Sequence, residues 1–344
     1  MRKEYKAPFF IIGTERSGTN LLRLLLNTHS HITIPHPPHI MKNFFRLEPL
    51  YGDLSVDVNF KKLIIDVVKM VELHPYPWEV RLDKEKIFRE ARERNLISIF
   101  FCAYNQHLES THKIRWGCKS TFMIYHVALI RHYYPLAKFI YMVRDGRDVA
   151  ASAKKSIFNR YCVYYTANLW KKEQQIGMYW LSALSQDNII LVKYEDILRN
   201  PAEAVKSVCF FLDEPYEENM LNFFHTEEAK KSGSISISWA NTSKSIMKSN
   251  FNKFNTELKE SEIRLFEAIA GEELGYFSYQ LTQPFYISEG ARARGIRFKI
   301  RYALEEIYLF LKAQVSHFIR DKNNLLRFKK FWFLKLAMIM RVLR

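Results

Sequence analysis

The segment from Gly13 to Asn20 reads G-T-E-R-S-G-T-N and has the spacing of a phosphate-binding loop. An apolar run at 9–12 precedes it and a leucine-rich run at 21–26 follows, so we expect a strand, a tight loop and a helix. Thr19 and Asn20 stand where G-x-x-x-x-G-K-[ST] has its Lys and Ser/Thr. The loop is therefore predicted to bind a 5′-phosphate, but not the triphosphate that a Walker lysine holds.

The composition of this loop favours anion binding over an ordinary turn. Gly13 and Gly18 permit a close approach of the backbone to a ligand, and successive N–H groups at a helix start bind anions. Donor side chains are interleaved with the glycines. The candidate ligand-binding residues are Arg16, Ser17, Gly18, Thr19 and Asn20.

Two further polar segments also follow apolar runs. Arg144 begins R-D-G-R-D-V-A-A-S, which ends at Ser152, about two helical turns further on. An arginine fork and a serine hydroxyl at this spacing could close on one phosphate, although an Arg–Asp surface network explains the segment equally well. Tyr194 follows the run at 189–192 and could contact a base. Taken by itself, this tyrosine is better explained as a structural aromatic at the rim of the sheet.

The elements that must position these residues form an α/β pattern. Four short apolar runs read as buried parallel strands, at 9–12, 114–117, 139–143 and 189–192, and each precedes polar residues and a helical pattern. We therefore expect a three-layer α/β/α fold with a central parallel sheet. Ligands of such folds bind beyond the carboxyl ends of the strands, where the three polar segments lie.

The net charge indicates the class of binding partner, and the cysteines indicate the cellular compartment. The net charge of +16 over 344 residues indicates an anionic partner. The four cysteines are scattered, which signals neither a zinc site nor a disulfide framework, so we expect a reducing, cytoplasmic environment. The N-terminal residues show no signal-peptide pattern and no transmembrane anchor.

The segment 286–344 differs from the rest of the chain. It contains fourteen Lys or Arg residues against four Asp or Glu, and its apolar residues recur at helical spacing. The apolar positions are Leu304, Ile307, Tyr308 and Leu311, followed by Leu325, Phe328, Phe331, Trp332 and Leu336. A basic helix of this kind either lies on an anionic membrane surface or packs on the domain with its basic face solvated, and the basic excess favours the membrane.

Taken together, these motifs resemble those of the sulfotransferase family. The octet and the L-L-R after it are similar to the family's 5′-phosphosulfate loop, V-R-D-G-R-D-V-A-A-S to its 3′-phosphate motif, and K-Y-E-D-I-L-R-N-P to the segment whose Tyr contacts adenine. G-E-E-L-G-Y at 271–276 resembles the end of the family's last helix. The match runs from about residue 5 to 280, which suggests a sulfotransferase domain at 1–285 and a basic helical extension at 286–344.

The resemblance implies that the donor is 3′-phosphoadenosine 5′-phosphosulfate (PAPS), that the product is 3′-phosphoadenosine 5′-phosphate (PAP), and that no metal is essential. Arg16 takes a position where many relatives carry Lys, which implies that it stabilises the bridging and leaving oxygen. Lys119 resembles the family lysine that binds the transferring sulfuryl group. Lys253, joined by Ser249, corresponds to a segment that closes over the 3′-phosphate, but Phe254 replaces the usual Trp.

The general base has to be sought outside the usual motif. Relatives with K-T-H carry a catalytic His two residues after the lysine, whereas this chain has Thr121 there. Other branches use a Glu after the first helix, and here that segment, 29–39, has four histidines and no carboxylate. We expect His36, or else His39, to accept the acceptor proton, because a neutral imidazole suits this role near pH 7. A metal site is disfavoured by the spacing.

Two other functions compete with sulfuryl transfer from PAPS to a hydroxyl or amine. A P-loop nucleotide kinase would need the missing loop lysine, and a non-enzymatic protein that binds glycans or nucleic acid through the tail would not need the ordered motifs. We expect no nucleic-acid partner. The acceptor is open among a saccharide or lipid-linked glycan, a lipid and a tyrosine-containing substrate, with the region 44–108 shaping its pocket.

Overall fold

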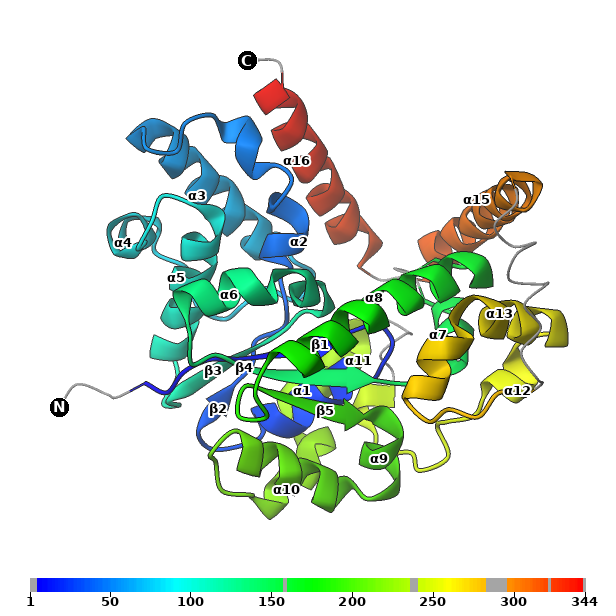
Figure 1. Ribbon diagram of the computed structural model, residues 1–344. Coiled ribbons are helices and arrows are strands. Elements are labelled where there is room, and N and C mark those ends of the chain that lie inside the picture. Colours follow the sequence, from blue (N-terminus) through cyan, green and yellow to red (C-terminus); the bar gives the residue numbers. More distant parts are fainter. Residues whose placement is uncertain (1–4, 157–159, 236–240, 283–295, 321–322, 343–344) are drawn as a thin grey trace.

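Five parallel strands form the centre of the structure, a computed structural model that describes residues 5–156, 160–235, 241–282, 296–320 and 323–342. The strand order is β2-β3-β1-β4-β5 (Figure 1). The strands are β1 (Phe9–Gly13), β2 (Ile32–Thr33), β3 (Arg115–Lys119), β4 (Lys138–Val143) and β5 (Ile189–Lys193). The predicted α/β fold and its four strands are confirmed, while the short edge strand β2 has too few residues to give a pattern.

Strand register brings the predicted polar segments to one edge of the sheet. Ile11 of β1 pairs with Lys119 of β3, and Gly13 pairs with Met142 of β4. Val143 pairs in turn with Lys193 at the end of β5. The segments that follow β1, β3, β4 and β5 therefore all begin at the carboxyl edge.

Helices cover both faces of this sheet, because every residue of β1 is buried. Phe10 and Ile12 belong to a core formed with α3 (Asp57–Glu72), α5 (Leu96–Glu109), α6 (Val127–Tyr133), α8 (Val163–Ala183) and α13 (Glu260–Tyr276). Phe9 and Ile11 pack instead with α1 (Thr19–Asn27), α10 (Pro201–Phe211) and η3 (Glu218–His225). Residues of adjacent positions in a strand point to opposite faces, so one apolar run supplies both cores. This is the expected three-layer arrangement (Figure 1).

The helical elements follow the strands in the expected alternation, with a helical insertion between β2 and β3. Before β4 they are α1 (Thr19–Asn27), α2 (Ile40–Phe44), η1 (Glu48–Tyr51), α3 (Asp57–Glu72), α4 (Lys84–Glu90), α5 (Leu96–Glu109), η2 (Thr121–His126) and α6 (Val127–Tyr133). After β4 they are α7 (Gly146–Ala153), α8 (Val163–Ala183), α9 (Tyr194–Arg199), α10 (Pro201–Phe211), η3 (Glu218–His225), α11 (Glu227–Ile235), α12 (Phe254–Glu257) and α13 (Glu260–Tyr276).

Two long helices occupy the C-terminal segment, α15 (Ile296–Arg320) and α16 (Asn324–Val342). The expected boundary at residue 285 falls outside the described residues. Helix α16 lies against α3 and η1, beside the insertion between β2 and β3 (Figure 1). No helix among the described residues combines the length and apolar character needed to cross a membrane.

Candidate PAPS and acceptor site

The loop after β1 has the backbone conformation that its glycines predict. Gly13 and Gly18 have φ angles of 139° and 83°, and Arg16 between them has a φ of 74°. A Cβ at Gly13 would lie 2.2 Å from the carbonyl oxygen of Met142, so a side chain there would collide with β4. Gly18 is the N-cap of α1, which directs the helix start towards the carboxyl edge of the sheet.

Gly18 is also required by a contact that the sequence did not reveal. A Cβ at this position would lie 2.2 Å from Cδ2 of Tyr194, whose ring packs directly on the loop. Tyr194 is buried, and the guanidinium of Arg144 lies over its ring at 4.5 Å from the centroid. Asn250 donates to the Tyr194 hydroxyl at 2.7 Å. The tyrosine predicted to meet adenine is thus fixed between the loop and Arg144.

The loop and the segment after β4 join through two arginines. Arg16 donates from Nε to the Ser152 hydroxyl at 3.0 Å, and Arg144 donates from Nη1 to the Arg16 carbonyl oxygen at 3.2 Å. Burial, and next the charge of Arg144, lowers the pKa of Arg16 to about 10, so Arg16 is charged at neutral pH. Two cationic groups are therefore held close together, as a multiply charged anion requires.

Asp148 fastens a third segment over this site. Its carboxylate accepts from the backbone N–H groups of Asn252 and Phe254 at 2.8 and 2.9 Å. Lys253, between those two residues, lines the cavity, whereas Ser249 is exposed and is not among the lining residues; the neighbouring Asn250 lines it instead. The structure therefore brings Lys253 to the site and leaves Ser249 at its outside.

Several buried donors at this end of the site have no hydrogen-bond partner among the described residues. They are the Ser17 hydroxyl, the Asn20 side-chain amide nitrogen and Nε of Arg144. Buried donors without partners are costly, so their presence around one loop points to an anionic ligand that satisfies them. Asn20 and Arg144 line the cavity, whereas Ser17 lies behind its wall.

Lys119 ends β3 and is almost fully buried, with 8% of its surface exposed. Burial, and next the charge of Arg23, lowers its pKa to about 7. Arg23 is fully buried and donates to the Asn20 side chain at 2.8 Å and to the Ile34 carbonyl oxygen at 3.1 Å. Sequence reasoning missed this arginine, which ties the loop helix to the segment that carries the histidines.

The four histidines of that segment separate into two pairs. His29 bonds the carbonyl oxygen of Pro215 and His31 bonds the Glu214 carboxylate, both outside the cavity. His36 and His39 line the cavity. Among the described residues, no group of three or more His, Cys, Asp or Glu side chains is placed to hold a metal ion.

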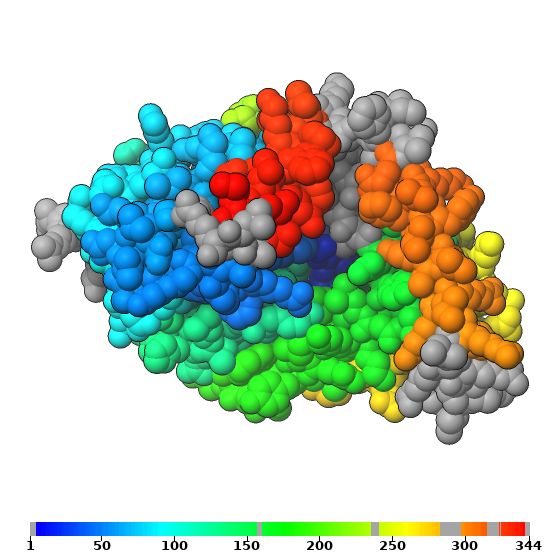
Figure 2. All heavy atoms as spheres, turned by 90° about the horizontal axis from the view of Figure 1, so that it is seen from above, coloured from blue at the N-terminus to red at the C-terminus, as the bar shows by residue number. Residues whose placement is uncertain are grey.

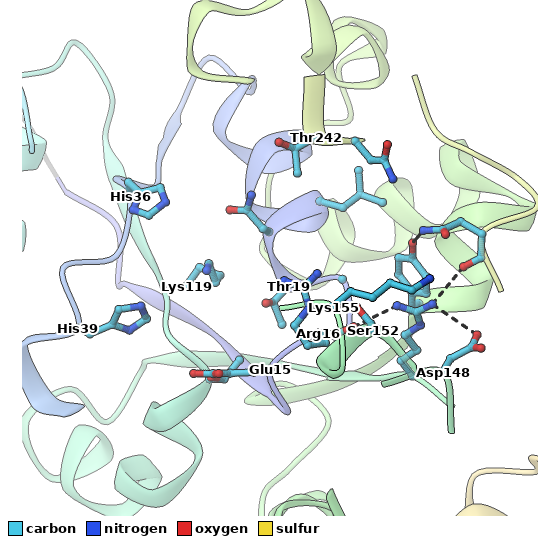
Figure 3. Close-up of a pocket in the computed structure, with 18 of the residues that line it drawn as sticks. Glu15, Arg16, Thr19, His36, His39, Lys119, Asp148, Ser152, Lys155 and Thr242 are labelled. Atoms are coloured by element: carbon cyan, nitrogen blue, oxygen red, sulfur yellow. Dashed lines mark hydrogen bonds and ion pairs between the residues drawn. The ribbon is translucent and has the colours of Figure 1, made fainter. Parts of the chain in front are cut away.

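His36 and His39 are both neutral at physiological pH. Burial, and next the charges of His74 and Lys42 respectively, lowers both pKa values well below the usual range. His36 is only 2% exposed, whereas His39 is half-buried and its Nδ1 lies 3.4 Å from the Ser120 hydroxyl. Lys119 lies between these histidines and the Arg16–Ser152 pair (Figure 3).

One carboxylate enters this half of the site from an unexpected place. Glu15 belongs to the phosphate-binding loop and lines the cavity near His39 and Lys119 (Figure 3). It forms an ion pair of 2.7 Å with Lys42 of α2. The sequence separates the two residues, and only the packing of α2 on the loop brings them together.

One cavity of about 750 Å³ is lined by the loop after β1, by His36 and His39, and by the segments that follow β3, β4 and β5. Of the residues predicted from the sequence, only Ser17 and Ser249 do not line it. Helix α16 contributes a wall that the sequence did not predict. Its lining residues are Arg327, Lys330, Phe331 and Leu334.

Comparison with known proteins agrees with this geometry. A model of the "Sulfotransferase family" matches residues 8–218, which is more than half of the chain. Protein-tyrosine sulfotransferase 1 of Danio rerio is 23% identical over 234 residues, covering 67% of this chain and 59% of that protein. Protein-tyrosine sulfotransferase 2 of Gallus gallus is 21% identical over 235 residues, covering 67% of this chain and 56% of that protein. This chain thus spans little more than half the length of these relatives.

A solved structure shows the same fold. The sulfotransferase domain from the olefin synthase of Synechococcus PCC 7002 superposes with a TM-score of 0.53 at 18% identity, over 81% of this chain and 97% of that one. Mouse sulfotransferase SULT7A1 complexed with PAP has a TM-score of 0.44 at 12% identity, over 80% of this chain and 84% of that one. Because the family model matches more than half of the chain, including the sheet and the loops that follow its strands, the chain belongs to the sulfotransferase family.

Proposed function

We propose that this protein transfers a sulfuryl group from PAPS to a hydroxyl or amine of an acceptor. The observation that carries the proposal is the joined pair of arginines. Arg16 and Arg144 are linked through the Arg16 carbonyl oxygen, and Arg16 also bonds Ser152, on one wall of the cavity. A nucleotide with phosphates at two positions satisfies both cations and the unpaired donors beside them.

Each part of the donor has a candidate set of residues. The loop and the start of α1 would hold the 5′-phosphosulfate through their N–H groups and through the Thr19 and Asn20 side chains, which line the cavity. The second set would hold the 3′-phosphate. It consists of Arg144, Ser152 and Lys253, with Tyr194 beside the adenine.

The chemistry is a displacement at sulfur. The acceptor oxygen or nitrogen bonds to sulfur while the bond from sulfur to the 5′-phosphate oxygen breaks and PAP leaves. Arg16 would stabilise the charge that develops on the bridging oxygen, and Lys119 would stabilise the sulfuryl oxygens. The acceptor proton would pass to His39, which is the more accessible of the two neutral imidazoles, with His36 as the alternative.

The acceptor half of the cavity combines apolar and cationic walls. Phe331 and Leu334 supply apolar surface, while Lys42 and Lys330 supply charge. This lining is compatible with each proposed acceptor: a saccharide or lipid-linked glycan, a lipid, or a tyrosine side chain such as the named relatives modify. The four cysteines are buried and free. A cytoplasmic location stays a prediction.

One assay tests the reaction itself. The protein is incubated with PAPS labelled in its sulfuryl group and a panel of hydroxylated acceptors, and PAP release is followed together with label transfer. Binding of PAP is measured in parallel by calorimetry, with ATP and Mg²⁺ as the comparison. PAP binding without ATP binding supports the proposal; ATP binding with phosphoryl transfer would establish the kinase instead.

Replacing Arg144 by Ala is expected to weaken PAP binding about 10- to 100-fold, because a charge-assisted bond to a phosphate is lost. Binding of 5′-AMP, which lacks the 3′-phosphate, should change much less. The comparison of the two nucleotides in the wild type and in Arg144→Ala isolates the contribution of the 3′-phosphate. Equal losses for both nucleotides would remove Arg144 from that role.

Donor affinity is expected to fall by about tenfold as the pH rises from 6 to 9, through Lys119. Its pKa is lowered to about 7, so deprotonation above this pH removes a positive charge facing the anionic donor. Lys119→Arg keeps the charge throughout and should give a flatter profile. Calorimetric titration with PAPS, without an acceptor, measures both proteins at each pH, because PAP lacks the sulfuryl group that Lys119 would contact. Parallel profiles of the two proteins would contradict the assignment.

A further inference from the structure

The two C-terminal helices expose apolar faces that no other described element covers. On α15, Ile300, Leu304, Ile307 and Leu311 recur at intervals of three or four residues and are all exposed. On α16 the same spacing continues. Its exposed stripe consists of Leu325, Phe328, Trp332, Leu336 and Met340. These two helices carry more than half of the exposed large hydrophobic side chains among the described residues.

The opposite face of α15 is the one that packs on the domain. Glu306 is buried and accepts from the backbone N–H groups of Tyr161 and Cys162, at 3.0 and 2.8 Å, and these two residues directly precede helix α8. Tyr302 stacks on Tyr164 of α8, with 4.7 Å between ring centroids. Because these contacts fix the inner face, the exposed apolar stripe is not a packing face of this domain.

Helix α16 is oriented in the same way. Phe333 and Leu334 pack on the main hydrophobic core, and Lys330 donates to the Pro38 carbonyl oxygen at 3.4 Å. The inner face of α16 thus forms a wall of the cavity, and its outer face points to solvent. A helix that is apolar on both faces has a second surface to bury.

The charges beside the exposed stripes are of one sign. The exposed charged side chains described on the two helices are Arg297, Lys299, Arg301, Lys312, Lys329 and Lys335. Among the described side chains of these helices, Glu305 is half-buried and Glu306 is buried, so no acid is fully exposed there. A basic rim around apolar stripes is complementary to an anionic lipid surface.

We propose that the outer faces of α15 and α16 form a docking surface for an anionic lipid bilayer. Both helices lie on the face of the molecule that Figure 2 shows, α16 in red and α15 in orange. The apolar side chains would enter the headgroup boundary, and the lysines and arginines would meet the phosphates. Since α16 also lines the cavity, docking would bring the acceptor half close to molecules in the membrane.

Vesicle sedimentation tests this surface without any sulfuryl transfer. The full chain is mixed with vesicles of phosphatidylcholine alone and with vesicles that contain phosphatidylglycerol. We expect binding to the anionic vesicles, weakened by salt. A variant with Leu325, Phe328, Trp332 and Leu336 all replaced by Ser should lose about tenfold or more of this affinity, and Lys329→Gln with Lys335→Gln should lose about fivefold or more.

Matched controls distinguish binding through this surface from non-specific adsorption of exposed apolar side chains to vesicles. Phe210 of α10 and Leu136 are exposed by 87% and 74% and lie away from these helices, so Phe210→Ser and Leu136→Ser should bind vesicles as the wild type does. A second variant, Leu304→Ser with Ile307→Ser and Leu311→Ser, tests α15 independently. Unchanged Tm and PAP binding show that each variant is folded.

The proposal fails if the wild type does not bind anionic vesicles at low salt, or if the folded α16 and α15 variants bind as well as the wild type. It also fails if the chain is a dimer in solution, the substitutions dissociate this dimer, and vesicles leave it intact. A second copy of the chain would then cover the stripes. Loss of PAP binding in the wild type would instead contradict the proposed reaction and leave the docking result unaffected.

Discussion

Arg16→Ala is expected to lower kcat by about 10²- to 10³-fold, the effect of removing one fixed donor to a developing oxyanion. The side chain is oriented by its bond to Ser152, and its carbonyl oxygen is held by Arg144, so the guanidinium needs no reorganisation during the reaction. PAP affinity should fall by less than about tenfold, because Arg144 and the loop N–H groups remain. Steady-state kinetics with PAPS, together with PAP calorimetry, measure both quantities.

Arg16→Lys is the matched control for this prediction. A lysine keeps the charge and occurs at this position in relatives that the loop resembles, so it should retain much more activity than Ala. Because the pKa of Arg16 is lowered only to about 10, the charge is present over the whole assay range and no titration should accompany the loss. A kcat of Arg16→Ala within about threefold of the wild type would remove Arg16 from the chemistry.

His39→Ala is expected to lower kcat by about 10²-fold or more, the range for loss of a general base. Burial, and next the charge of Lys42, holds the pKa of His39 well below its usual range, so the imidazole is neutral and can accept a proton. PAP affinity should stay within about twofold, because His39 lies on the acceptor side of Lys119 (Figure 3). Added imidazole should restore part of the activity of the Ala variant.

The pH profile and a matched histidine make this test specific. With the pKa of the base lowered, the acid limb of kcat/KM should fall below pH 6.5, since protonation of the free enzyme's histidine is what stops the reaction. His36→Ala, at the more deeply buried site, should cost less than about tenfold. If the losses are reversed, the role belongs to His36; if neither variant loses activity, the histidine base is wrong.

Local signals were sufficient for four of the five strands and for the polar segments that follow them. Apolar runs followed by helical patterns predicted four strands, because buried parallel strands need continuous apolar residues. Since parallel strands end at one edge, the segments at Gly13, Lys119, Arg144 and Tyr194 had to meet there. Nothing beyond strand order and spacing was needed for this part.

Contacts between distant segments could not be predicted in the same way. The two-residue strand β2 has no pattern of its own, yet it leads the histidine segment to the same edge of the sheet. Arg23 has the sequence pattern of an ordinary helix residue, but it is buried and bonds the Ile34 carbonyl oxygen of the histidine segment. Ser249 does not line the cavity. The sequence left open whether the segment 286–344 packs on the domain or on a membrane, and only the structure shows that Arg327, Lys330, Phe331 and Leu334 of α16 line the cavity.

By itself, the sequence determined the fold class, the glycine-containing loop after β1 and the polar segments that meet at the carboxyl edge of the sheet, because these depend on short-range spacing and on strand direction. Only the tertiary structure decided which of four histidines reach the cavity, that Glu15 pairs with Lys42, and that a C-terminal helix closes one side. These features arise when elements far apart in the chain bury surface against one another, and no local pattern records which elements will do so.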